Sequence, residues 1–127
     1  LAVLADLLRF AGRTADGLRA IEEGFAHAER AGEHGYLSEL HRAKAELLRV
    51  TEGDAAAEPD FAEAVEQARR QQARAFELRA ATGWAQLMAD AGRIKEAREL
   101  LEPVYSWFTE GLGTADLVAA RATLTRL

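Results

Sequence analysis

Apolar residues recur along the chain every three to four positions, in stretches separated by glycines. In the first stretch Leu1, Leu4 and Leu8 share one face of a helical projection, and later stretches repeat the pattern. A spacing of i, i+3 and i+4 places side chains on one side of an α-helix. β-branched residues form no alternating runs, so strands have little support. The pattern predicts an all-α protein.

The boundaries of the expected helices follow from glycine, proline and capping residues. Gly12 and Gly92 are expected to end helices, because glycine accepts the left-handed conformation found there. Pro59 fits best in a first turn, so its helix is expected to begin near Ala57 or Glu58. Thr114 is the expected N-cap of the last helix. The seven helices should cover approximately residues 1–11, 14–31, 36–50, 57–72, 76–91, 94–110 and 115–126.

A repeat of about 40 residues is the sharpest regularity in the sequence. Small residues recur at this interval in the first helix of each unit, at Ala5, Ala45 and Ala85. In the second helices a small residue precedes a large one by four positions, in the pairs Gly17 and Ile21, Ala57 and Phe61, and Ala97 and Leu101. A small residue lets two backbones approach, and a large one a turn later fills the adjoining space. We expect one domain of three helical hairpins, at approximately 1–32, 36–72 and 76–110, with a closing helix at 114–127.

Two runs carry a family resemblance. The run Glu77–Leu124 and the shorter run ELHRAKAELL (Glu39–Leu48) resemble tetratricopeptide-like (TPR) repeats, although the standard unit has 34 residues. They are most similar to the C-terminal TPR-like region of large bacterial signalling regulators, which join an ATPase to a cyclase or DNA-binding output domain. The resemblance implies a right-handed superhelix in a longer cytoplasmic chain, acting as a non-enzymatic protein-interaction scaffold. It implies no ATPase or cyclase activity, because those motifs are absent from the sequence.

Composition and charge narrow the possible partners. The formal net charge is −5 and the chain has no basic block, so nucleic acid is not an expected partner. Arg69, Arg70 and Arg74 form the densest positive spot, which we interpret as a solvated helix face. No apolar run approaches the roughly 20 residues of a membrane span. The chain has no cysteine, which excludes disulfides and thiolate metal sites.

The sequence offers few candidates for chemistry. His27, His34 and His41 recur every seven residues, but a glycine-containing turn separates them, so no metal site is expected. The acidic pairs Glu22–Glu23 and Glu96/Glu99 are expected on outward helix positions rather than in a cleft that would perturb them. We therefore expect no enzyme activity and no cofactor.

The first helices of stacked hairpins line the concave side of such an array, which is the usual binding surface. The residues expected to face this groove are Asp6, Arg9, Glu39, Arg42, Glu46, Arg49, Arg79, Thr82 and Gln86. Among them the candidates for partner binding are Glu39, Arg42, Glu46, Arg49, Arg79 and Gln86. Two interpretations stay open. The charges could form a solvated face paired with itself, as in Arg42–Glu46, or a polar groove for a peptide or a neighbouring domain.

Alternative roles rest on the ends of the chain and on the aromatic residues. A first helix without an upstream neighbour would expose Leu1, Leu4 and Leu8, so the chain could form a homodimer or stack on its parent's ATPase domain. Val104, Tyr105 and Phe108 are expected to pack under the last helix against Leu117 and Leu124. A small-ligand pocket beside Trp84 or Trp107 is a weaker alternative.

Overall fold

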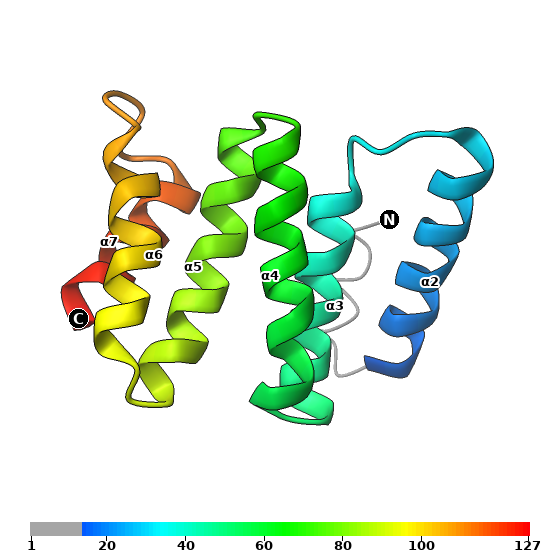
Figure 1. Cartoon of the computed structure of the whole chain (residues 1–127), viewed down its shortest axis with the longest axis horizontal. Helices are drawn as coiled ribbons and strands as arrows, with labels where there is room; N and C mark the ends of the chain where they lie inside the picture. The colour runs from blue at the N-terminus through cyan, green and yellow to red at the C-terminus, as the bar shows by residue number, and fades with distance from the viewer. Residues whose placement is uncertain (1–13) are drawn as a thin grey trace.

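The computed structural model describes residues 14–127, which form helices joined by short loops (Figure 1). The helices are α2 (Thr14–Ala31), α3 (Leu37–Thr51), α4 (Asp54–Arg70), α5 (Arg74–Asp90), α6 (Ile94–Ser106) and α7 (Ala115–Arg126). No strand occurs in this range, so the all-α prediction is confirmed for residues 14–127. The first expected helix, with Ala5, Asp6 and Arg9, lies outside the described residues.

The helices are arranged in two layers. Each helix packs against the next one in the chain, and α5 also packs against both α3 and α7. Within residues 14–127, α2, α4 and α6 make no such contacts among themselves. Figure 1 shows α3 behind α4 and α7 behind α6. The layer of α3, α5 and α7 is therefore the more closely spaced one, as is the inner layer of a curved helical array.

The residues that define the repeat lie between packed helices, as the sequence predicts. Ala45 and Ala85 in the first helices of two hairpins have no exposed surface, and neither have Ala57 and Ala97 in the second helices. The large residues that follow, Phe61 and Leu101, are also buried. Ala45, Ala57 and Phe61 belong to one apolar cluster. The predicted register is confirmed for the hairpins α3–α4 and α5–α6.

The predicted start of α4 is wrong by about one turn. The helix begins at Asp54 rather than at Ala57 or Glu58, and Pro59 lies inside it. Proline lacks an N–H, so only the carbonyl of Ala55 loses its helical donor. Ala55 is exposed to solvent, and water can satisfy that carbonyl. A proline near the start of a helix therefore costs too little to fix the boundary.

The predicted end of α6 is also wrong, whereas α7 agrees with its predicted range. α6 ends at Ser106 instead of Glu110, three residues after Pro103, and the Phe108 N–H bonds to the Tyr105 carbonyl in a tight turn at 3.1 Å. Thr114 is the N-cap residue of α7, but its side chain makes no capping hydrogen bond. Proline near a helix end removes one of the few remaining bonds, which favours early termination.

The close approach of α4 and α5 depends on Gly83 in the middle of α5. A Cβ atom placed at Gly83 would lie 2.7 Å from a ring carbon of the buried Phe61. Glycine in a helix interior costs about 1 kcal/mol relative to alanine. The repeat pattern does not single out Gly83, because the contact that requires it comes from another helix.

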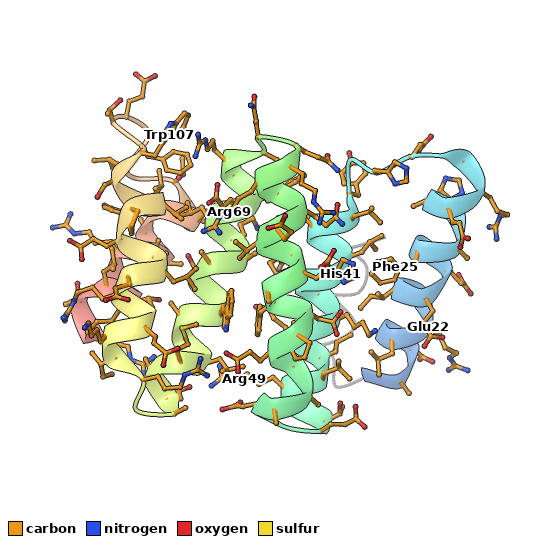
Figure 2. The ribbon with its side chains drawn as sticks, in the orientation of Figure 1. Glu22, Phe25, His41, Arg49, Arg69 and Trp107 are labelled. Carbon is orange, nitrogen blue, oxygen red and sulfur yellow. The ribbon has the colours of Figure 1, made fainter. Side chains whose placement is uncertain are left out.

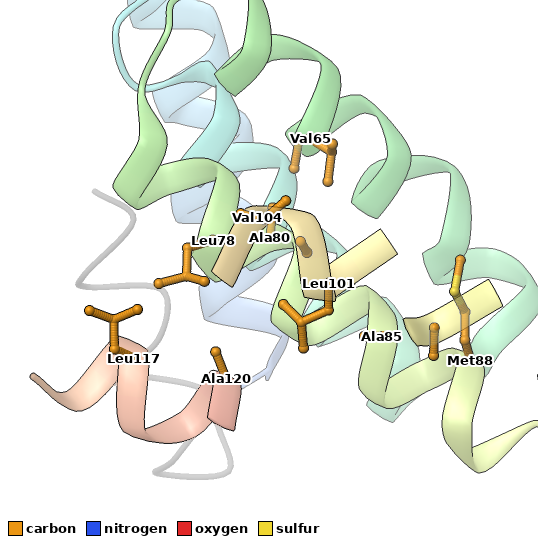
Figure 3. Close-up of a cluster of buried hydrophobic side chains, with 12 residues drawn as sticks. Val65, Leu78, Ala80, Ala85, Met88, Leu101, Val104, Leu117 and Ala120 are labelled. Carbon is orange, nitrogen blue, oxygen red and sulfur yellow. The ribbon is translucent and has the colours of Figure 1, made fainter. Parts of the chain in front are cut away.

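The largest apolar cluster lies at the C-terminal end, where α5, α6 and α7 meet (Figure 3). Figure 3 shows Leu117 and Ala120 on the side of α7 that faces Leu78. Val104 is buried in this cluster, and the partly buried Tyr105, Phe108 and Leu124 pack against it. The prediction that these aromatic residues pack under the last helix is confirmed.

Candidate functional site

The predicted groove residues lie on α3 and α5 and meet in the closely spaced layer. Glu39 on α3 and Arg79 on α5 are 40 positions apart and form an ion pair between the two helices. Arg79 also reaches Asp116 on α7, with 3.5 Å between its Nε and the carboxylate Oδ1. Equivalent positions in successive repeats are thus joined by charge across three helices.

Glu39 and Arg42 are buried, which the sequence did not predict. Only 4% of Glu39 and 5% of Arg42 are exposed. The Arg42 Nε donates to Glu39 Oε2 at 2.7 Å, and its Nη1 donates to Glu46 Oε2 at 2.6 Å. The predicted pair Arg42–Glu46 is confirmed. Of the two open interpretations, a solvated face does not describe Glu39 and Arg42, because both are buried. We call Glu39, Arg42, Glu46, Arg79 and Asp116 the Glu39 network.

A second set of ion pairs crosses the same three helices nearer the opposite end of α3. Arg49 donates to Asp54 Oδ1 at 2.8 Å and to Asp90 Oδ2 at 2.5 Å. Arg126 on α7 donates to the other oxygen of Asp90 at 2.6 Å. We call Arg49, Asp54, Asp90 and Arg126 the Arg49 network. Figure 2 shows Arg49 near the turn between α3 and α4.

Hydrogen bonding shifts the pKa values inside the Arg49 network. Bonds from Arg126 and Arg49 lower the pKa of Asp90 below its ordinary value of 3.8. Burial alone would lower the pKa of Arg49, but its bonds to Asp54 and Asp90 outweigh burial and raise it. Both shifts favour the charged forms of Arg49 and Asp90.

Gln86 and Thr82 complete the predicted groove residues in the described range. The Gln86 amide donates to the Thr123 hydroxyl of α7 at 3.1 Å, and Gln86 is half-buried. Thr82 is buried, and its hydroxyl bonds to the Leu78 carbonyl of its own helix at 2.7 Å. Gln86 is therefore available at the surface of this layer, whereas Thr82 is not.

The exposed surface of α3, α5 and α7 carries charged side chains of both signs, which already pair with one another. The predicted residues that keep solvent contact are Glu46, Arg49, Arg79 and Gln86. The sequence did not point to Asp90, which pairs with Arg49, to Asp116, which pairs with Arg79, or to Arg126, which pairs with Asp90. The repeat spacing was a usable signal for Asp90, which lies 41 residues after Arg49. A partner would bind here by exchanging its own charged groups for these exposed pairs.

The histidines are separated by the fold. His27 and His34 are exposed in α2 and in the loop after it. His41 lies on α3, with its Nδ1 hydrogen-bonded to Asp60 Oδ1 at 2.9 Å and its ring 4.7 Å from that of Phe25 (Figure 2). Over residues 14–127 no group of three or more His, Cys, Asp or Glu residues could hold a metal ion. Within the same range no helix is both long and apolar enough to cross a bilayer.

The two tryptophans differ in environment. The Trp84 indole donates to Glu58 Oε2 at 2.8 Å, and the same carboxylate pairs with Arg93 at 2.9 Å. Trp107 is 54% exposed and stacks edge-on against Phe108. The guanidinium of Arg74 lies 4.9 Å from its ring centroid. Trp84 is thus engaged in a polar contact, while Trp107 contacts Phe108 and Arg74 and keeps about half of its surface in solvent.

No family model, no curated protein and no solved structure matches the chain.

Proposed function

We propose that the chain is a TPR-like right-handed superhelix that serves as a non-enzymatic protein-interaction module. In this proposal it belongs to a cytoplasmic bacterial regulator of signal transduction or transcription, with an ATPase and an output domain elsewhere in the longer chain. The sequence resemblance supports the regulator. The two-layered stacking of hairpins with a shared small-residue register supports the repeat architecture.

The interaction role is supported mainly by the surface that α3, α5 and α7 form together. Successive hairpins present the half-exposed Arg49 and Gln86 there, with Arg49 paired to the carboxylate of Asp90 and Gln86 bonded to Thr123. Opposite charges on neighbouring repeats, such as Arg49 and Asp90, suit an extended peptide that pairs with both. The ion pairs already present hold these side chains in place before a partner arrives, which reduces the entropy lost on binding.

The proposal can be tested by selecting ligands for the full chain from a random peptide library and mapping their binding by calorimetry. Arg49→Ala and Gln86→Ala should each weaken the selected peptides by about tenfold, the effect of losing one charge-assisted contact. Lys95→Ala and Arg98→Ala on the exposed side of α6 are the controls and should leave affinity unchanged. A library that yields no ligand, or ligands indifferent to Arg49 and Gln86, would contradict the proposal.

A second candidate is a structural segment that associates with a second copy. The observation in its favour is the exposure of apolar side chains near the C-terminus. Val118 in α7 is 53% exposed, and Leu112 in the preceding loop is also exposed. Light scattering tests it, because Val118→Glu should convert a dimer into a monomer. A wild-type monomer at high concentration would contradict it. The role predicted for Leu1, Leu4 and Leu8 in a homodimer stays a prediction, since these residues lie outside the described range.

A further inference from the structure

The turn between α4 and α5 contains a strained residue where its counterpart has glycine. In both this turn and the turn between α5 and α6, the third residue donates its N–H to a carbonyl five positions back, at 2.9 Å for Ala73 and 2.8 Å for Arg93. The middle residue is left-handed in both, with φ of +80° for Gly92 and +55° for Gln72. A non-glycine residue in this conformation is strained, and such strain gathers at functional sites.

Gln72 lines a surface cavity whose other walls are charged. The cavity has a volume of about 280 Å³ and is lined by Arg69, Gln72, Arg74 and Glu77. Glu77 is buried, and its carboxylate receives the Arg69 Nε at 3.1 Å and approaches the Arg74 Nη1 at 3.7 Å. Two guanidinium groups from two helices therefore share one carboxylate, which leaves one positive charge in excess.

The arginines are placed to receive a ligand. Their side chains are 53% and 47% exposed for Arg69 and Arg74, although the carboxylate they share is buried. The helix α5 begins at Arg74 and has Ala73 as its N-cap, without a side-chain capping bond. The uncapped N–H groups of a first helical turn add positive potential at the same place. Arginine forks suit planar oxygen anions, which they bind through two parallel hydrogen bonds.

Trp107 provides an apolar surface next to the arginines that line the cavity. Its ring packs on Arg74, and more than half of its surface is open to solvent. Figure 2 shows Trp107 and Arg69 at the same end of the molecule, opposite the end that carries Arg49. The cavity is thus separate from the surface formed by Arg49 and Gln86.

We propose that this cavity binds the carboxylate of an acidic peptide segment, with a neighbouring apolar side chain of that peptide on Trp107. A monoanion neutralises the single excess positive charge of the cavity. A phosphate dianion would leave a net negative charge there, in a chain whose net charge is already −5. The sequence grouped Arg69, Arg70 and Arg74 as one solvated face, but in the structure they have different roles. Arg69 and Arg74 form the site, and Arg70 pairs with Glu66 at 3.2 Å.

The test uses the full chain and the blocked peptide Gly-Leu-Glu-Leu-Gly, with glutamine and phosphoserine versions of its central residue. The indole N–H signals in a ¹H–¹⁵N NMR spectrum report the two tryptophans separately. The glutamate peptide should shift the Trp107 signal to saturation and leave Trp84 unmoved. The glutamine version should bind about tenfold more weakly, because it lacks the charge-assisted bonds.

Two substitutions and a control locate the site. Arg69→Gln and Arg74→Gln should each weaken the glutamate peptide by about tenfold, while Arg70→Gln, with the same loss of charge one residue away, should change affinity less than about twofold. Equal effects of Arg69→Gln and Arg70→Gln, an unmoved Trp107 signal or equal binding of the glutamine peptide would overturn the proposal. Tighter binding of the phosphoserine peptide would overturn the assignment to a carboxylate.

Gln72→Gly separates loss of the site from loss of the fold. Glycine relaxes the left-handed backbone and removes one wall of the cavity. The variant should unfold at a higher temperature than the natural chain and yet bind the glutamate peptide more weakly. Unchanged binding by this variant would exclude Gln72 from the site and count against the cavity as the binding place. This outcome does not depend on the function proposed for the Arg49 surface.

Discussion

The Glu39 network and the Arg49 network both join α3, α5 and α7 by ion pairs, but the centre of the Glu39 network is shielded from water and the Arg49 network is not. The side chains of Arg42 and Glu39 are 6% and 5% exposed, whereas those of Arg126 and Asp90 are 50% and 45% exposed. A buried charge that loses its partner cannot recover hydration, while an exposed one can. Ion pairs between repeats can therefore serve two purposes: the Glu39 network holds the helices in register, and the exposed Arg49 network can exchange partners.

The largest effect should come from Arg42→Met. The variant leaves Glu39 and Glu46 without the guanidinium that joins them. Removing one partner of a buried ion pair destabilises by about 3–5 kcal/mol. Urea unfolding at neutral pH measures the change, and a loss below about 1 kcal/mol would contradict the structural role given to the Glu39 network.

The double variant Arg42→Met with Glu39→Gln is the control for that prediction. Removing both charges leaves no buried carboxylate that has lost its bond from Arg42, so the double variant should lose less stability than the two single losses combined. A coupling energy of about 1–3 kcal/mol is expected for groups in direct contact. Strict additivity would show that Arg42 acts through packing of its alkyl chain instead.

A smaller effect is expected for Glu39→Gln alone. The amide keeps the shape of the side chain, and Arg42 and Arg79 each retain a carboxylate, in Glu46 and Asp116. The loss should be about 2 kcal/mol, in the range of one buried hydrogen bond to a charged group. A loss of stability as large as that of Arg42→Met would show that Glu39 contributes as much to the network as Arg42.

The exposed network should contribute little to stability. Asp90→Asn removes the carboxylate that joins Arg49 to Arg126. Because all three side chains contact water, the loss should be at most about 1 kcal/mol at low salt and should shrink as salt is added. A loss that exceeds this and resists salt would remove the distinction between the two networks.

The smallest effect expected is the pH dependence of the stability that Asp90 contributes. The pKa of Asp90 in the folded chain is lowered from 3.8, so the ionised carboxylate stabilises the fold above that pH. The contribution should fall away as pH drops below about 4 and through the lowered folded pKa. Unfolding curves of the natural chain and Asp90→Asn should therefore converge in acid. Curves that stay equally far apart at every pH would show that Asp90 acts without its charge.

The helices and their register could be predicted because they depend on local spacing. The pair Arg42–Glu46 was predictable for the same reason, since residues four apart on a helix always meet. The start of α4 at Asp54 and the end of α6 at Ser106 were predicted wrongly. α6 ends three residues after Pro103, whereas Pro59 lies inside α4 and removes only a single helical bond. One bond contributes less than the packing of the helix as a whole.

The helical class, the 40-residue spacing of the small residues and the packing of the C-terminal aromatic residues could be read from the pattern of apolar positions. The burial of Glu39 and Arg42, the room that Gly83 leaves for Phe61, and the convergence of Arg69 and Arg74 on Glu77 arise from contacts between helices. Helical pitch fixes which residues of one helix share a face, and it is the same in every context. Contacts between helices depend on how closely and at what angle whole hairpins cross, which no single stretch of sequence specifies.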